Sequence, residues 1–481
     1  MKLVYGVQDK PSWGKTIVFA LQQLLAIMAA TIAVPMIINN NFPALAEQNM
    51  AMSTTAALFG AGVGTLVYLL FTKFRSPVFL GSSFAFLSSM IAAFSGATAS
   101  YTLGYVGLIL GAVFAGLVYV IIAIIIKFAG VKWLNKLMPA VVIGPTVAII
   151  GLSLAGNAVG DLVGAIKDGN GNFIMTAHAG ACMVSGLVTL AVTIICSVYG
   201  KKMLKMIPFI IGILAGYAVA AIFTGIGAAT GNEELKIINF SLFNDAFSKW
   251  YPDFSFLNAF KGFGELDGAY VGTIAVAYVP VAFVVFAEHI ADHKNLSTII
   301  EHDLLEDPGL HRTLLGDGVG SMAGAFFGGC PNTTYGESVG CVAISGNASV
   351  RTIFTTAIMA IVIAFISPFA TFLATIPSCV MGGVCIALYG FIAVSGLKMI
   401  QEVDLGDNKN LFVVCVILIA GVGGMSLKFG QVTITKVACA LILGILVNLL
   451  VNIGGKKKEN TETAATAKAT VAADKPEEEN K

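Results

Sequence analysis

Long apolar runs recur along this chain of 481 residues and decide what it can fold into. Runs of about 20 apolar residues begin near residue 16 and end near residue 453, and each can cross a bilayer as a helix. Only 11% of the residues are charged, whereas soluble domains carry about 25%. The sequence therefore predicts an all-α polytopic membrane protein and excludes a soluble globule. No cleavable signal peptide is expected, because the first apolar run continues into a full span.

Hydropathy and helix breakers divide these runs into fourteen expected spans. They cover residues 14–38, 52–73, 84–98, 102–128, 135–157, 176–199, 203–225, 268–291, 309–328, 335–346, 350–375, 377–397, 409–426 and 433–453. The third and the tenth of these ranges are too short to cross a bilayer alone.

Lysine and arginine fill every second loop, which indicates the orientation of the chain in the membrane. The intervening loops "NNNFPALAEQNM" (39–50) and "FSGATAS" (94–100) contain neither residue, whereas the long outer loop 226–266 is mixed. Both termini are therefore expected in the cytoplasm, with the protein in the cytoplasmic (inner) membrane. Residues 455–481 are charged and of low complexity, and we expect them to form a disordered cytoplasmic tail.

Two pairs of similar segments occur in the same order in both halves of the chain. Residues 138–156 resemble residues 376–396, and "GSSFAF" (81–86) resembles "NTTYGE" (332–337). Seven spans per half is an odd number, so a repeated second half is inverted in the membrane. Inverted repeats with a short segment at matching positions point to the binding site of a transporter.

A polar stretch with a proline precedes each of the two short spans. We expect each stretch to be a short extended strand that leads into a half-helix beginning in mid-membrane. The first turn of such a half-helix presents unpaired N–H groups and the positive end of the helix dipole. Irregular backbone at this depth survives only inside protein or beside a wet cavity. Two facing half-helices would therefore form a polar socket for carbonyl oxygens or anions.

Ionisable residues inside the spans are costly and are functional candidates. Glu288, Glu337 and Asp317 qualify, and Asp292 lies four residues after Glu288, on the same helix face.

Catalytic and metal-binding patterns are weak in this sequence. His289 and His293 have the spacing of metal ligands, but no third ligand is visible, so no metal site is expected. The eight cysteines are scattered without a C-x-x-C motif and are interpreted as buried thiols. The sequence contains no Ser/His/Asp nucleophile set that would indicate an enzyme. No sequence feature favours a channel.

Four segments resemble the nucleobase–ascorbate transporter family, also called nucleobase:cation symporter-2, and within it the bacterial uracil:proton symporters. They are "SSFAF" (82–86), "AEHI" (287–290), "DPGLHR" (307–312) and "PNTTYGE" (331–337), and the resemblance covers nearly the whole chain. It implies a 7+7 inverted repeat and a transporter, not an enzyme, that imports uracil with protons and needs no cofactor. A purine (xanthine or urate) proton symporter of the same family is the alternative. An anion transporter of the same architecture is a weaker one, because two carboxylates would favour a cation.

The resemblance also implies how the spans divide into domains. The core domain would comprise residues 14–128 and 267–375, and the gate domain residues 129–225 and 376–454, with the outer loop 226–266 between them. Substrate would lie in the core domain, which would move against the gate domain. Members of the family are thought to form homodimers through the gate domain.

Six residues match the substrate site of the family. Glu288 and Glu337 would bind the polar edges of the base, and Phe84 would pack against its ring and offer a backbone amide. Tyr335 and Gly336 would face the substrate from the start of the second half-helix, and Tyr389 would contact it from the gate domain. Purine members commonly carry glutamine where Glu337 stands, so this glutamate favours uracil.

The resemblance assigns proton coupling to Glu288, Asp292 and His293, with Glu288 as the main proton carrier. A carboxyl group removed from water holds its proton more readily, so protonation of Glu288 would favour substrate binding and its release would accompany discharge inside.

Five positions depart from the pattern of the family. Gln23 stands where the first span often has histidine, and Asp292 stands where the eighth span often has histidine. Ser338 replaces the usual asparagine after Glu337, and Ser345 with Gly346 replaces Thr-Arg.

Overall fold

The computed structural model describes residues 3–97, 100–130, 139–201, 203–245, 247, 250–401, 403–429 and 432–453. The predicted tail 455–481 lies outside the described residues, as do residues 131–138, which include the first residues of the fifth predicted span.

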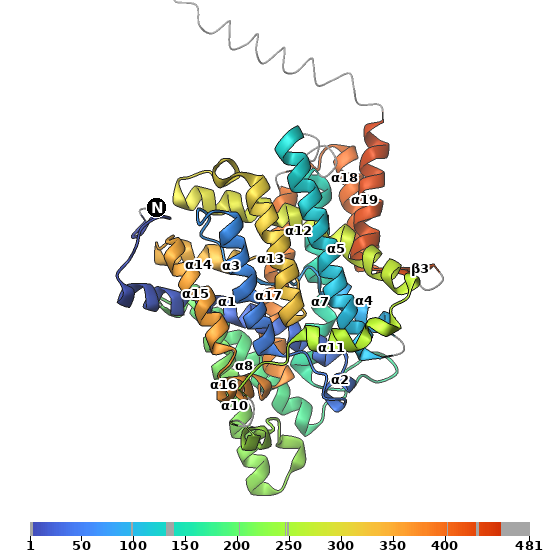
Figure 1. Cartoon of the computed structure of the whole chain (residues 1–481). Coiled ribbons are helices and arrows are strands. Elements are labelled where there is room, and N and C mark those ends of the chain that lie inside the picture. Colours follow the sequence, from blue (N-terminus) through green and yellow to red (C-terminus); the bar gives the residue numbers. More distant parts are fainter. Residues whose placement is uncertain are drawn as a thin grey trace, which may run out of the picture.

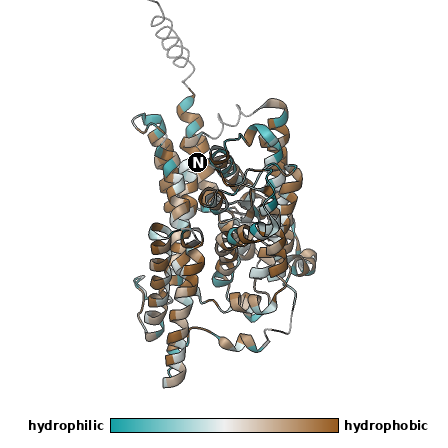
Figure 2. Cartoon of the chain, turned by 90° about the vertical axis from the view of Figure 1, so that its left-hand side faces the viewer, coloured by the Kyte–Doolittle hydropathy of each residue, from teal (hydrophilic) through white to brown (hydrophobic). Residues whose placement is uncertain are grey.

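Eight helices in the described part of the chain are long and apolar enough to cross a membrane. They are α1 (Trp13–Asn41), α3 (Thr54–Phe71), α5 (Tyr101–Ala129), α7 (Ala140–Val163), α8 (Ala177–Tyr199), α10 (Pro208–Thr230), α12 (Gly268–Ile300) and α17 (Ser378–Gln401). A ninth candidate is a bent pair, α15 (Val350–Ile363) with α16 (Ser367–Ala374), whose axes differ by 83°. Figure 2 shows that apolar residues cover much of the helical part of the molecule. The prediction of a multi-pass helical membrane protein is confirmed.

Shorter helices complete the set. They are α4 (Leu87–Gly96), α13 (Leu310–Gly328), α14 (Gly336–Ser345), α18 (Asn408–Val422) and α19 (Lys436–Asn452). Each predicted span overlaps one of the helices named so far, but the count of fourteen crossings and the 7+7 inversion stay predictions. Loops carry the helical turns α2 (Ala44–Glu47), α9 (Met203–Met206), α11 (Ser255–Gly262), η1 (Glu233–Leu235), η2 (Phe240–Asp245), η3 (Phe263–Glu265) and η4 (Leu305–Gly309). A hairpin joins β3 (Leu427–Phe429) to β4 (Val432–Ile434).

The two predicted extended segments are strands, and they pair with each other. β1 (Leu80–Ser82) and β2 (Asn332–Thr334) are antiparallel, with Leu80 opposite Thr334 and Ser82 opposite Asn332. Each strand leads within a few residues into a half-helix, α4 after β1 and α14 after β2. Pairing satisfies backbone groups that would otherwise be unpaired in an apolar interior. This strand crossing, the antiparallel pair of β1 and β2, is buried and therefore holds the beginnings of both half-helices inside the fold.

Glycines in α3 and α13 make room for this crossing. A Cβ at Gly64 would lie 2.5 Å from Nδ2 of Asn332, and a Cβ at Gly324 would lie 2.1 Å from the same atom. Asn332 donates from Nδ2 to the carbonyl oxygen of Gly60 at 3.0 Å. The small residues of "GAGVG" (60–64) also permit close packing of α3 on α13, because a Cβ at Gly60 would lie 2.5 Å from the carbonyl oxygen of Gly324.

The helices pack in two groups. In Figure 1, α12, α13 and α17 lie near the centre of the molecule. In the first helix group, α13 packs on α3 and α5, and α5 also contacts α12 and α4. Helix α15 packs on α3, and α1 packs on α15 and α14. In the second helix group α17 packs on α7 and α8, α10 on α8, and α18 on α19 and α7. The first group contains the helices of the predicted core domain and the second those of the predicted gate domain.

Candidate functional site

A cavity of about 360 Å³ lies between the two helix groups, where the strands cross. The first group contributes residues from the segment after β1, from α12, and from β2 with the start of α14. The second group contributes residues from α7, α10 and α17. The lining residues are Ser83, Phe84, Ala85, Val147, Ile150, Phe209, Glu288, Ala291, Asp292, Thr333, Thr334, Tyr335, Gly336, Glu337, Leu388, Phe391, Ile392, Ser395 and Met399. A mostly apolar cavity with a few convergent polar groups is the usual form of a small-molecule site.

Three carboxylates face this cavity. Glu288 and Asp292 lie one turn apart on α12, and Glu337 lies in the first turn of α14. All three side chains are half-buried, because the cavity exposes them. Thr334 donates from Oγ1 to Oδ2 of Asp292 at 2.8 Å, which ties this carboxylate to β2. In the described part of the chain, the carboxylates of Glu288 and Glu337 bond to no other side chain and are available to a ligand.

The beginning of α14 brings backbone donors to the same cavity. Gly336 and Glu337 are its first two residues, and the N–H of Val339 is the first to bond back, to the carbonyl oxygen of Tyr335 at 3.2 Å. The N–H groups before it have no partner within the helix. A half-helix beginning here thus supplies donors beside the acceptor oxygens of Glu337.

Aromatic side chains form the apolar walls. Phe84 lines the cavity and is buried, and Tyr335 lines it while donating from its hydroxyl to the carbonyl oxygen of Ser82 at 2.6 Å. Gly81 makes room for the Tyr335 ring, since a Cβ there would lie 2.4 Å from a ring carbon. The position of this ring therefore depends on the strand crossing.

Tyr389 lies behind the wall instead of lining the cavity. Its ring packs edge-on against Phe84, with centroids 5.9 Å apart. From α17, the cavity is lined by residues 388, 391, 392, 395 and 399. Tyr389, the predicted gate-side aromatic, therefore contacts Phe84 and does not itself line the cavity.

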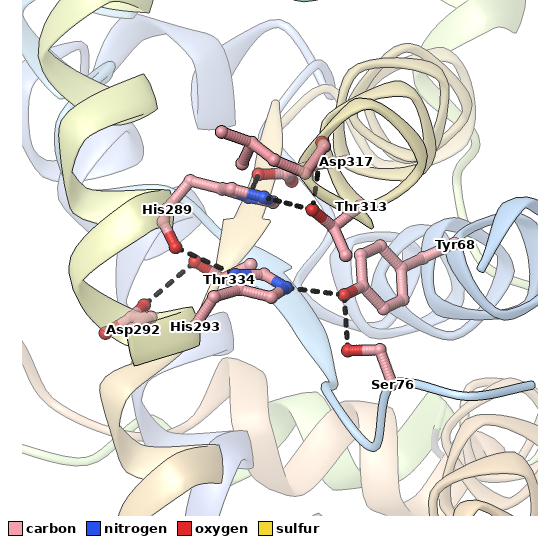
Figure 3. A network of polar contacts seen from close by, with 9 residues as sticks. Tyr68, Ser76, His289, Asp292, His293, Thr313, Asp317 and Thr334 are labelled. Carbon is pink, nitrogen blue, oxygen red and sulfur yellow. Dashed lines mark hydrogen bonds and ion pairs between the residues drawn. The ribbon is translucent and has the colours of Figure 1, made fainter. Parts of the chain in front are cut away.

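His289 and His293 turn away from the cavity into a buried polar network, shown in Figure 3. Asp317 Oδ2 lies 2.8 Å from Nδ1 of His289, and Thr313 Oγ1 lies 3.0 Å from its Nε2. His293 Nε2 lies 2.7 Å from the hydroxyl of Tyr68, which lies 2.7 Å from Ser76 Oγ. The two imidazoles stack with centroids 4.0 Å apart.

This network explains the spacing of the two histidines. Tyr68 comes from α3, and Thr313 and Asp317 come from α13, so the histidines join α12 to both helices. No group of three His, Cys, Asp or Glu side chains in the described ranges could hold a metal ion. Asp317, a sequence candidate, belongs to this network and not to the cavity lining.

The structure therefore brings together six of the predicted site residues and separates two. Phe84, Glu288, Asp292, Tyr335, Gly336 and Glu337 share the cavity, whereas Tyr389 and His293 lie outside it. Sequence reasoning missed Thr334, the partner of Asp292, and the apolar residues of α7 and α10. A hydroxyl residue in "NTTYGE" was the available signal for Thr334, but nothing in the apolar spans distinguishes Val147, Ile150 or Phe209.

A ligand in this cavity would meet acceptor carboxylates, backbone donors and aromatic faces at once, inside a bundle of apolar helices. The pairing of discontinuous helices near the middle of a membrane bundle defines a class, the membrane transporters, in which such breaks carry the binding site. The arrangement is that of a transport protein and not of an enzyme.

The chain belongs to the permease family, whose model (Xan_ur_permease) matches residues 14–429. It is 39% identical over 455 residues to the uracil permease of Bacillus caldolyticus, covering 93% of this chain and 95% of that protein. It is 38% identical over 467 residues to the uracil permease of Bacillus subtilis, covering 96% and 98%. The uracil permease of Escherichia coli K12 is 36% identical over 448 residues, covering 92% and 93%.

Solved structures with little sequence identity share the fold. The transmembrane domain of the cyanobacterial bicarbonate transporter BicA superposes with a TM-score of 0.59 at 13% identity, covering 93% of this chain and all of that domain (100%). The murine anion transporter Slc26a9 superposes with a TM-score of 0.65 at 11% identity, covering 93% of this chain and 69% of that protein. These likenesses concern architecture alone.

Proposed function

We propose that this permease imports uracil across the cytoplasmic membrane together with protons. One observation carries the proposal: Glu288 from α12 and Glu337 from the first turn of α14 converge on a single cavity, which Phe84 from the first half of the chain also lines. The names of its relatives over nearly the whole chain agree with this substrate.

The chemistry of the cavity complements a pyrimidine base. Uracil presents two N–H donors and two carbonyl acceptors around a flat ring. An ionised carboxylate only accepts hydrogen bonds, whereas a protonated one also donates. Glu337 would accept from one ring N–H while the first N–H groups of α14 donate to a carbonyl oxygen. Glu288 would bind the other edge, with Phe84 and Tyr335 against the ring.

Glu288 is the proposed proton carrier. It faces the cavity beside Asp292, one helical turn away, so a proton on either carboxyl group relieves the repulsion between them. Binding of a proton by this pair of carboxylates would favour substrate binding. Loss of that proton on the inner side would release the substrate. Because His293 faces Tyr68, its role would be to hold α12 in place and not to exchange protons with the cavity.

Transport would proceed by movement of the core domain against the gate domain. The cavity reaches Phe209 at the beginning of α10 and Met399 near the end of α17, at the side that the positive-inside pattern assigns to the cytoplasm. Support for the assignment of both termini to that side comes from Figure 1, where the N-terminus and the end of α19 lie in the upper part of the molecule. Fourteen spans in a 7+7 inverted repeat and a homodimer through the gate domain belong to the same proposal.

Uptake into proteoliposomes tests the proposal. Labelled uracil should accumulate above its outside concentration when the outside is made acidic, and a proton ionophore should abolish the accumulation. Unlabelled uracil should compete, whereas xanthine should not. Accumulation that ignores the pH gradient would contradict proton coupling, and competition by xanthine but not by uracil would favour the purine alternative.

A further inference from the structure

Gln23, Phe79 and Ser338 meet behind the wall of the cavity. Gln23 donates from Nε2 to Oγ of Ser338 at 2.6 Å, and the backbone N–H of Phe79 donates to the same oxygen at 3.3 Å. The three residues are at most 3% exposed, and none of them lines the cavity. A serine hydroxyl oxygen has two lone pairs and can accept both bonds.

The three residues come from three segments that the site requires. Gln23 lies on α1, Phe79 directly precedes β1, and Ser338 directly follows Glu337 in the first turn of α14. One oxygen atom therefore joins the strand that leads to Phe84 to the half-helix that presents Glu337. Gln23 adds the first span to this junction.

Two of the positions are those at which this sequence departs from its family. Ser338 is a shorter residue than the usual asparagine, and Gln23 is an uncharged amide where histidine is common. The structure shows that the two departures contact each other, so each residue supplies the partner that the other needs. A buried amide or hydroxyl left without a partner is costly.

We propose that Ser338 and Gln23 are positioning residues for substrate binding, which fix the carboxylate of Glu337 relative to Phe84. The proposal rests on uracil being the ligand of the cavity. Neither side chain touches the ligand; both act through the first turn of α14 and the approach to β1. Displacement of a binding group by about 1 Å is enough to weaken a preorganised site.

Calorimetry of uracil binding to the purified protein is the test, with four variants. Ser338→Ala removes the shared acceptor and should weaken binding about tenfold, the value of one or two buried hydrogen bonds. Ser338→Thr keeps the hydroxyl and should bind like the wild type. Gln23→Leu should weaken binding alone and add little when combined with Ser338→Ala, because both changes break the same junction.

The control is Ser185→Ala, which removes another buried serine hydroxyl, one that bonds within α8 and lies in the second helix group. Its uracil affinity should equal that of the wild type. Thermal unfolding of each variant separates positioning from loss of the fold, because a purely structural role would lower stability without a matching loss of affinity.

The outcomes are distinct. If the wild type binds no uracil, the proposed function is wrong, whereas the contact between Gln23 and Ser338 is not in question. If the wild type binds and Ser338→Ala binds equally well, the positioning role is wrong. Additive losses in the double variant, or a Ser338→Thr variant as weak as Ser338→Ala, would also overturn it.

Discussion

The carboxylates of the cavity differ in what holds them. Asp292 is bonded to Thr334, whereas Glu288 and Glu337 bond to no other described side chain. A carboxylate with a fixed partner suits a supporting role, and one left open to the cavity suits a ligand or a proton. This difference was not readable from the sequence, where Glu288 and Asp292 differ only by one helical turn.

Glu288→Gln should abolish proton-driven accumulation of uracil. The amide keeps the shape of the side chain and a hydrogen-bond donor, but it cannot exchange a proton. Exchange of inside for outside uracil, which needs no net proton movement, should persist. The measurement is uptake into proteoliposomes with and without a pH gradient, and Asp292→Asn tests the neighbouring carboxylate. Full accumulation by Glu288→Gln would contradict its role as proton carrier.

Elements that are distant in the chain make the site. The sequence predicted two extended segments, each followed by a half-helix, because prolines and polar residues interrupt apolar runs there. It did not predict that β1 and β2 pair, because hydropathy contains no information about contacts between residues 80 and 334. The N-terminal segment was missed for the same reason: Val4 donates from its N–H to the carbonyl oxygen of Gly346 at 2.8 Å, just after α14.

Histidine spacing shows a similar limit. The i, i+4 pattern of His289 and His293 predicts two side chains on one helix face, which is correct, but the pattern does not say which face. Glu288 and Asp292 repeat at the same interval and face the cavity, whereas the histidines face α3 and α13. The packing of α12 against its neighbours decides which of the two pairs faces the cavity.

Gly81→Ala should disturb the strand crossing. The new Cβ would lie 2.4 Å from a ring carbon of Tyr335, so the ring or the strand must move. Overpacking of this kind costs about 1–3 kcal/mol. Thermal unfolding should occur at a lower temperature, and uracil uptake should fall.

Gly340→Ala is the matched control for this change. It lies in α14, and a Cβ there would meet no atom within 4 Å. Its unfolding temperature should equal or exceed that of the wild type, because alanine favours a helix more than glycine does. If both variants behaved alike, the argument from the Tyr335 ring would be wrong.

Across the whole molecule, the two helix groups touch at the end of α1 that the positive-inside pattern places outside. Asn40 donates from Nδ2 to Oδ2 of Asp161 on α7 at 3.4 Å, and Ser378 on α17 donates from Oγ to Oδ1 of Asn40 at 3.1 Å. The side chains of Asn41 and Asn157 also meet, at 3.4 Å. The proposed movement of the core domain against the gate domain requires these contacts to separate when the cavity opens outward.

A link across this contact should stop transport. With cysteines at Asn41 and Asn157, a short bifunctional thiol reagent should join α1 to α7 and hold the outer side closed. Uptake should cease, whereas uracil should still bind from the inner side. The controls are the Asn41→Cys and Asn157→Cys variants, each with only one of the two substitutions and treated with the same reagent. Undiminished uptake by the linked protein would contradict movement between the helix groups.

The central claim is that Glu337 and the first N–H groups of α14 bind the polar edge of uracil. Calorimetry of uracil binding to Glu337→Ala tests this claim most directly. Removal of a charged acceptor in a buried site should weaken binding roughly 100-fold or more. Thermal unfolding would verify that the variant is folded. A folded Glu337→Ala protein whose uracil affinity is lower by at least this factor is the result that we predict. An affinity equal to that of the wild type would contradict the claim.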